Sequence, residues 1–331
     1  MAYIYKKAVG DKIYYYLRVS SRKGTRIIAK DVAYLGSTLD EVRSALKKIS
    51  SAVLRKAHKT IQRFLESNTY LEKAKNLNLK TTPFIDKNLL EEIEACKIHW
   101  QHTFNQRDRR TQQQYIKLFA IDFAFNTTNI EGNTITLKQA QLLLSEHLTP
   151  KGKTLREIHD VQNTERVFLQ LIEQPLFLNH EFIIQTHSEL LRNVDPRVGY
   201  RTEEVHVFHA KFDSTPAPYV RTDIDLLIKW YEENEAKLHS FVLAGIFHHK
   251  FEKIHPFFDG NGRTGRILLN ASLLKHNYPP LIIRKRNRAV YLDALSTADK
   301  AELTHLKPEH YKPLINFLAT ELIQTYWNTF L

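Results

Sequence analysis

Apolar residues repeat with two different periods along this chain of 331 residues. From Tyr3 to about Gly36 the sequence is rich in Tyr, Val and Ile, and turn signals at Gly10 and Gly24 separate the strand-like runs, a pattern typical of a three-stranded meander. From Leu89 onward the apolar residues have helical spacing almost throughout. The sequence therefore predicts a mainly α-helical protein, preceded by a small N-terminal antiparallel β unit.

The stretch between these two patterns predicts one long amphipathic helix from Leu39 to Ser67, with Ser37 or Thr38 as its cap. The Asn- and Lys-rich residues 68–83 are the best candidate for the boundary between this helix and the helical part of the chain. We expect three parts: a small basic β unit at 1–38, a bridging helix and linker at 39–83, and a helical domain at 84–331. Within the last part, residues 200–220 predict a short β-hairpin with a proline-stiffened exit.

The positive charge of the chain is concentrated at its N-terminus. The formal net charge is +12, and residues 1–80 hold 18 basic against 6 acidic side chains, so the remainder sums to zero. Such a unit is suited to docking nucleic acid or an acidic protein, although basic faces also serve solubility alone. Tyr14, Tyr15 and Tyr16 near Arg18 could stack on bases, but tyrosine is also simply a good strand former.

The composition indicates a soluble globular protein, with 43% hydrophobic and 25% charged residues. Cys96 is the only cysteine, which excludes an internal disulfide and any multi-thiolate zinc site and agrees with a reducing compartment. The first residues lack the apolar core of a signal peptide, and no apolar run approaches the length of a membrane span. We expect a cytoplasmic protein with no membrane association.

One loop that opens a helix predicts an anion site. Gly260 and Gly262 flank Asn261 and allow backbone N–H groups to turn inward, where the start of the helix also favours negative charge. Arg263 and Arg266 lie three apart on the first turn and can both hold phosphate oxygens. We expect all five residues to bind phosphate groups of a ligand.

The same segment supplies groups for catalysis. Asp259 offers a hard oxygen ligand for Mg²⁺ that also holds substrate phosphates. His255 has an ordinary pKa suited to a general base near neutrality. Pro256 fixes the entry to the loop, and Phe257 is expected to plug the core beneath it.

The segment from His255 to Arg266 resembles the signature of the Fic (filamentation induced by cAMP) family, H-x-F-x-D/E-G-N-G-R-x-x-R, at every signature position. The resemblance implies an all-α Fic fold over roughly residues 89–331, and transfer of AMP from ATP to a Ser, Thr or Tyr hydroxyl of a target protein. It also implies that the hairpin near Glu203 to Phe212 is a flap that pairs with an extended target segment.

The resemblance further implies a role for each site residue. His255 would deprotonate the incoming hydroxyl, and Asp259 would hold a Mg²⁺ that bridges the phosphates. The backbone of Gly260-Asn261-Gly262 would cradle the α- and β-phosphates, and Arg266 would pair with the γ-phosphate. Because Gly262 is not the lysine of the phosphate-transferring branch that resembles the toxin Doc, we expect nucleotidyl rather than phosphoryl transfer.

A second segment, Thr127 to Asn133, resembles the family's inhibitory motif S/T-x-x-x-E-G/N, with Thr127, Glu131 and Gly132 in the matching positions. The resemblance implies intramolecular inhibition, with Glu131 paired to Arg266 so that ATP binds unproductively. Three alternatives stay open: removal of AMP from a modified target at the same site, a nucleic-acid-binding regulator that acts through the basic N-terminal unit, and a homodimer that buries the inhibitory segment.

Overall fold

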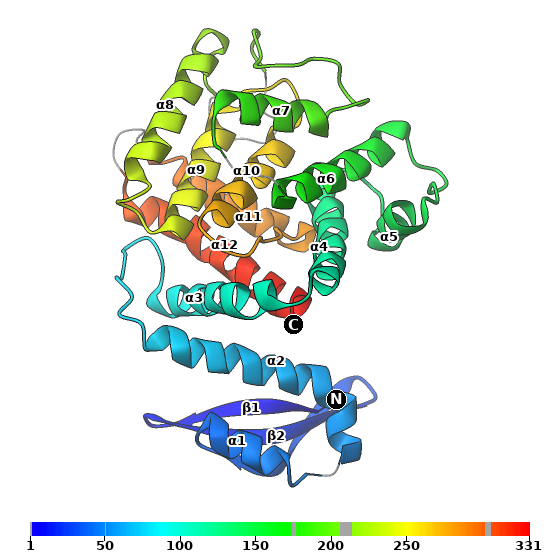
Figure 1. The fold of residues 1–331 in the computed structure, drawn as a ribbon, viewed down its shortest axis with the longest axis vertical. Coiled ribbons are helices and arrows are strands. Elements are labelled where there is room, and N and C mark those ends of the chain that lie inside the picture. The colour runs from blue at the N-terminus through cyan, green and yellow to red at the C-terminus, as the bar shows by residue number, and fades with distance from the viewer. Residues whose placement is uncertain (1, 50, 174–176, 206–213, 302–305) are drawn as a thin grey trace. The chain divides into compact units, whose positions relative to one another are not determined.

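The computed structural model describes residues 2–49, 51–173, 177–205, 214–301 and 306–331 (Figure 1). The chain divides into two compact units, which meet in the sequence at Leu79 and Lys80. The first unit contains the sheet and the second is helical, so the predicted fold class, mainly helices preceded by a small antiparallel β unit, is confirmed. Every helix in the described parts is too short or too polar to cross a lipid bilayer.

The sheet of the first unit is an antiparallel meander of β1 (Ala2–Val9), β2 (Lys12–Lys23) and β3 (Arg26–Gly36), in the spatial order β1-β2-β3. Gly10 and Gly24 form its two turns with φ of 58° and 60°, a conformation that glycine adopts without a steric penalty. One face of the sheet is buried through Ile4, Leu17 and Leu35.

Two helices follow the sheet, α1 (Leu39–Leu46) and α2 (Ser51–Lys75), so the prediction of one helix from Leu39 to Ser67 was wrong. The Thr38 side chain caps α1 by accepting from the Glu41 N–H at 3.3 Å. Both helices supply buried side chains to the same core beneath the sheet. The chain has to turn between them for both apolar faces to reach that core, and packing therefore overrides the continuous helical pattern.

The second unit consists of helices and the loops that join them. In chain order they are α3 (Lys87–His102), η1 (Phe104–Gln106), α4 (Arg109–Ile130), α5 (Leu137–Glu146), α6 (Leu155–Glu173), α7 (His180–Leu190), η2 (Ala217–Tyr219), α8 (Val220–Asn234), α9 (Ser240–Ile254), α10 (Asn261–Lys275), η3 (Lys285–Asn287), α11 (Arg288–Ala298) and α12 (Pro308–Thr329). The predicted hairpin near Glu203 to Phe212 falls largely on residues 206–213, which lie outside the described residues.

Helices α9 and α10 form the centre of the second unit, with α4, α6, α7, α8 and α12 around them (Figure 1). Nearly every residue of α10 is buried, as expected of a helix packed on all sides. It contacts α9, α7, α4 and α6. This arrangement brings side chains that are distant in the sequence to the amino end of α10.

Candidate active site

The loop between α9 and α10 is braced by Asn261. Its Oδ1 accepts a hydrogen bond from the Phe257 N–H (2.9 Å), and its Nδ2 donates to the Phe257 carbonyl (2.8 Å). Gly260 precedes α10 with a φ of 78°, and a Cβ there would lie 2.5 Å from Leu191 Cδ2. The Asn261 side chain is thus used within the loop, and only its backbone N–H, at a helix end that leaves such groups without helical partners, can face a ligand.

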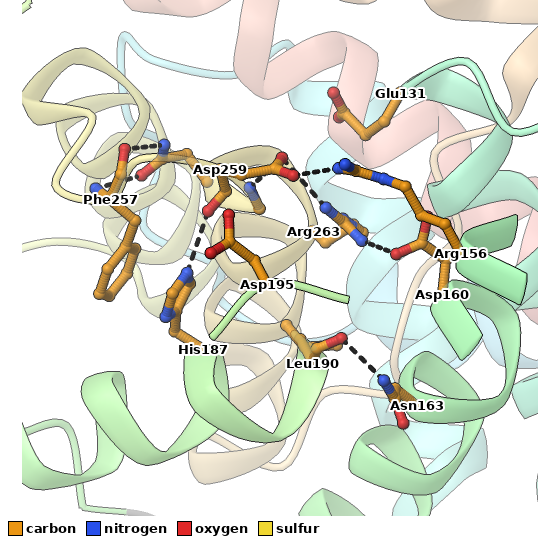
Figure 2. Close-up of polar contacts among 12 residues, drawn as sticks. Glu131, Arg156, Asp160, Asn163, His187, Leu190, Asp195, Phe257, Asp259 and Arg263 are labelled. Atoms are coloured by element: carbon orange, nitrogen blue, oxygen red, sulfur yellow. Dashed lines mark hydrogen bonds and ion pairs between the residues drawn. The ribbon is translucent and has the colours of Figure 1, made fainter. Parts of the chain in front are cut away.

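Phe257 is fully buried. This confirms the prediction that its side chain fills the core beneath the loop. Its ring stacks on that of His187 in α7 with 3.7 Å between the centroids, and His187 Nε2 donates to the Asp259 carbonyl at 3.0 Å (Figure 2). Burial lowers the pKa of His187 to about 4, so the ring is neutral and holds the loop from below. Nothing in the local sequence marks His187 for this role.

His255 ends α9 in the left-handed conformation, with φ 53° and ψ 59°. Its Nδ1 lies 3.4 Å from the Glu252 carbonyl, which can only accept, so Nδ1 carries the proton and Nε2 is left as an acceptor. Burial lowers the pKa of this imidazole from its ordinary value. At neutral pH the ring is therefore uncharged and able to take a proton.

Arg201 is a residue of this site that no motif marks. Its buried side chain donates from Nε to the His255 carbonyl at 2.8 Å and from Nη1 to the Glu203 carbonyl at 3.1 Å, and its Nη2 donates to the Thr215 carbonyl. Its own N–H donates to the Pro256 carbonyl at 2.9 Å. One guanidinium thus ties the end of α9 to the two chain segments that flank residues 206–213.

Asp259 is held between two arginines (Figure 2). Its Oδ1 accepts from the Gly260 N–H (2.6 Å) and lies 3.2 Å from Arg263 Nη2, while its Oδ2 pairs with Arg156 Nη2. Burial alone would raise the pKa of this carboxyl, but the charges of Arg263 and Arg156 outweigh burial and lower it. Asp259 is therefore ionised at neutral pH.

Arg263, which the sequence predicts at the phosphates, is paired with two carboxylates. Its guanidinium is buried between Asp160 of α6 and Asp259, with which it forms ion pairs. Both partners are carboxylates, so the positive charge of Arg263 is already balanced. The ion pair with Asp259 also holds that carboxylate in place. Arg156 and Asp160 both lie in α6, about a hundred residues before Asp259 and Arg263 in the chain. No local sequence pattern therefore indicates that they belong to the site.

The Asp259 carboxylate can bind Mg²⁺ if a nucleotide supplies the other ligands of the ion. Mg²⁺ in nucleotide sites uses one or two carboxylates and takes its other ligands from phosphates and water. The described residues contain no group of three or more metal-ligating side chains, so the nucleotide would have to supply the remaining ligands. Arg156 covers one Asp259 oxygen, but its side chain is 57% exposed and can turn away.

The predicted pair of Glu131 and Arg266 is present. Arg266 Nη2 lies 2.7 Å from Glu131 Oε1, at the carboxyl end of α4, and also donates to the Thr127 carbonyl at 2.9 Å. Arg266 Nε donates to Thr127 Oγ1 at 2.5 Å. The guanidinium is buried, whereas the Glu131 side chain is 40% exposed. Thr127 and Glu131 thus accept three hydrogen bonds from the Arg266 guanidinium.

Gly262 explains how the Glu131 carboxylate reaches the start of α10. A Cβ at Gly262 would overlap Glu131 Oε1 and lie 3.0 Å from Arg266 Nη1. Only a residue without a side chain leaves room for the carboxylate beside the first turn of the helix. A negative group therefore already lies where the helix dipole and Arg266 both favour an anion.

The chain has the fold of Fic proteins. It is similar to the structure of a Fic domain containing signaling protein from Bacteroides thetaiotaomicron, with a TM-score of 0.64 and 24% identity over 72% of this chain and 96% of that one. It is also similar to Fic-1 from Caenorhabditis elegans, with a TM-score of 0.61 and 22% identity over 88% of this chain and 92% of the other.

The sequence agrees with the fold. Residues 177–273 match the model of the Fic/DOC family. The chain is 27% identical over 255 residues to protein adenylyltransferase fic-1 from Caenorhabditis elegans, covering 73% of this chain and 47% of the relative. It is 30% identical over 205 residues to protein adenylyltransferase Fic from Drosophila ananassae, covering 59% and 38%. The chain thus spans about half the length of these curated relatives, or less.

Proposed function

We propose that this chain is a protein adenylyltransferase, which moves AMP from ATP to a hydroxyl of a protein target and is restrained by its own Glu131. One observation carries the proposal: the neutral imidazole of His255 and the amino end of α10 belong to the same short loop. A base and an anion site can therefore act on one polyphosphate. The names of the curated relatives support the same reaction.

In the proposed reaction, the target's hydroxyl oxygen attacks the α-phosphorus of ATP. A new phosphorus–oxygen bond forms, the bond from the α-phosphorus to its bridging oxygen breaks, and pyrophosphate leaves. The hydroxyl proton passes to Nε2 of His255, which can accept it because Nδ1 already carries the other proton. His187 and Arg201 keep the loop in place while the imidazole becomes charged.

The phosphates would be bound by the backbone N–H groups of residues 260–262 and by the positive end of α10. A Mg²⁺ held by Asp259 would neutralise charge on the phosphates as pyrophosphate departs. Arg266 would pair with the γ-phosphate, as a guanidinium does with two oxygens of one anion. Arg263 would contribute indirectly, by fixing the Asp259 carboxylate.

Restraint follows from competition for Arg266. The guanidinium has three partners at the end of α4, namely Glu131 Oε1 and the hydroxyl and carbonyl oxygens of Thr127. A γ-phosphate in the productive pose needs the same charge and meets the Glu131 carboxylate beside Gly262. ATP would then bind with its phosphates displaced, and the resting enzyme would be nearly silent.

The decisive experiment is intact-mass analysis after incubation with Mg²⁺-ATP. We expect the Glu131→Gly variant to gain AMP on its own chain faster than the wild type, by at least tenfold if the ion pair contributes about 1.4 kcal/mol or more. Adding His255→Ala should abolish the gain. Glu146→Gly, at an exposed glutamate of α5, is the matched control and should behave as the wild type.

An equal or lower rate in the Glu131→Gly variant would contradict the restraint, and modification that survives His255→Ala would contradict the assigned base. The same samples test the reverse reaction. If Glu131 aligns water for removal of AMP, the modified protein should lose AMP with Glu131 present and keep it in the Glu131→Gly variant.

A further inference from the structure

The outer face of the N-terminal sheet carries aromatic residues where an exposed sheet face normally carries polar ones. Alternate residues of a strand point to the same face, and Ile4, Leu17 and Leu35 define the buried one. The opposite face holds the alternate set, and we name it the tyrosine face. It consists of Tyr3, Tyr5, Lys7, Lys12, Tyr14, Tyr16, Arg18, Arg22 and Tyr34.

The register of the ladder joins these rings into one patch across all three strands. Tyr16 is opposite Tyr5 on one side and Tyr34 on the other. The ring centroids of Tyr16 and Tyr34 are 5.4 Å apart, and those of Tyr14 and Tyr34 are 6.4 Å apart. The Arg18 guanidinium lies 3.5 Å from the centroid of the Tyr5 ring. The patch thus offers several ring faces and a flat cation side by side.

Strand propensity explains why tyrosines are present but not which face they occupy. Tyr15 satisfies the fold from the buried face, where its ring contacts that of Phe64 at 5.7 Å. The rings of the tyrosine face stay wholly or partly exposed, and Tyr34 retains 54% of its surface. The fold of the unit does not bury them, and contiguous exposed apolar surface of this kind marks an interaction site.

The charge of the sheet selects the partner. Residues 2–36 hold eight Lys and Arg side chains but only two Asp side chains, so the sheet is positively charged. One of the two aspartates, Asp31, is paired with Arg18 at 2.6 Å. Lys7, Lys12 and Arg22 on the tyrosine face are exposed. Aromatic platforms bordered by cations bind single strands, whose unpaired bases stack on the rings while phosphates meet the cations. A duplex hides its base faces and cannot use the rings in this way.

We propose that the tyrosine face binds single-stranded nucleic acid, with bases stacked on Tyr16 and Tyr34 and phosphates near Lys7, Lys12 and Arg22. The proposal is independent of adenylyl transfer, because none of these residues belongs to the site at α10. It would give the enzyme a means of acting where a single strand is exposed.

Fluorescence anisotropy of the full chain with fluorescein-labelled oligothymidylate tests the proposal, with oligouridylate and a duplex of equal length as further probes. Tyr16→Ala and Tyr34→Ala should each weaken single-strand binding by about tenfold, the usual size of one stacking contact. Tyr16→Phe and Tyr34→Phe should bind as the wild type, because they keep the ring. Tyr219→Ala, at a 62% exposed tyrosine of the second unit, is the matched control.

Lys12→Glu, at an exposed strand end, provides a second arm and should weaken binding while reducing its salt dependence, since each phosphate contact contributes about 0.7 to the slope of log K against log[salt]. All these variants should keep the auto-modification rate of the parent. The proposal is overturned if the duplex binds as tightly as the single strands, if the alanine variants bind as the wild type, or if no probe binds.

Discussion

His255 depends on a neighbour for its backbone geometry. A residue other than glycine rarely adopts the left-handed region, and such strain persists at active sites when the surroundings fix it. Arg201 supplies that constraint, because its Nε holds the His255 carbonyl and its N–H holds the carbonyl of Pro256. Arg201 is therefore a positioning residue for the proposed base rather than a group that contacts ATP.

We expect Arg201→Lys in the Glu131→Gly background to lower kcat for auto-modification by roughly 100-fold, the usual effect of a misplacement of about 1 Å. A lysine has one ammonium and cannot reach the carbonyls of His255, Glu203 and Thr215 together. KM for ATP should change little, because the phosphate groups are bound elsewhere. Initial rates at varied ATP concentrations measure both constants.

Arg110→Lys, at an exposed arginine of α4, is the matched control for that substitution. Thermal unfolding of both variants shows whether the loss of rate reflects loss of structure. A rise in KM at constant kcat would contradict the positioning role, since it would place Arg201 in ATP binding.

At the scale of elements, α10 owes its polar surroundings to two glycines. Gly262 leaves room for Glu131, and Gly265 leaves room for Glu252 of α9, whose Oε1 would overlap a Cβ at position 265. The Glu252 side chain is 14% exposed, but its Oε1 is buried and has no hydrogen-bond partner in the described parts of the chain. Arg266 therefore has two acidic neighbours, Glu131, with which it forms an ion pair, and Glu252.

Gly265→Ala should destabilise the protein, although alanine is the better helix former by about 1 kcal/mol. The added methyl group would overlap Glu252 and lie 3.1 Å from Phe251 Cδ1, and overpacking of this kind costs about 1–3 kcal/mol. Urea unfolding measures the change. Combining Gly265→Ala with Glu252→Ala should recover part of the loss, and a higher midpoint for Gly265→Ala alone would contradict the packing argument.

Local patterns in the sequence predict the elements better than the contacts between them. The loop of residues 255–260 and the helix after it follow from short-range rules, whereas the role of Thr127 and Glu131 was expected only from the family resemblance. The break between α1 and α2 was missed because it is imposed by a shared core. Arg156, Arg201 and His187 were also missed, since packing around α10 brings them together from distant parts of the chain.

At the scale of the whole molecule, the second unit holds buried titratable groups whose pKa values are shifted in opposite directions. Burial lowers the pKa of His187 to about 4 and that of His248 to about 3. Burial raises the pKa of Glu252 to about 7, against the nearby Arg266 and with the help of the Glu131 charge. Folding therefore favours the neutral form of all three groups.

The histidines make the second unit less stable in acid. In the unfolded chain each histidine has a pKa near 6.5. The contribution of the two neutral rings to the free energy of unfolding is therefore complete above pH 6.5. It is lost as the pH falls through about 4 for His187 and about 3 for His248. Each lost pKa unit corresponds to about 1.4 kcal/mol. We expect the free energy of unfolding to fall between pH 6.5 and 4. Tryptophan fluorescence follows this unit alone, because all three tryptophans, Trp100, Trp230 and Trp327, lie in it.

Glu252 acts in the opposite sense. Its unfolded pKa is near 4.5, so the neutral carboxyl stabilises the fold below pH 4.5, and this contribution is lost as the pH rises through 7. Glu252→Gln cannot ionise and should therefore gain stability relative to the wild type between pH 4.5 and 8, by up to about 3 kcal/mol. Urea unfolding of both proteins, followed by tryptophan fluorescence across this range, measures the difference. A difference that stays constant with pH would show that the carboxyl is already ionised in the folded protein, with Arg266 rather than burial setting its charge.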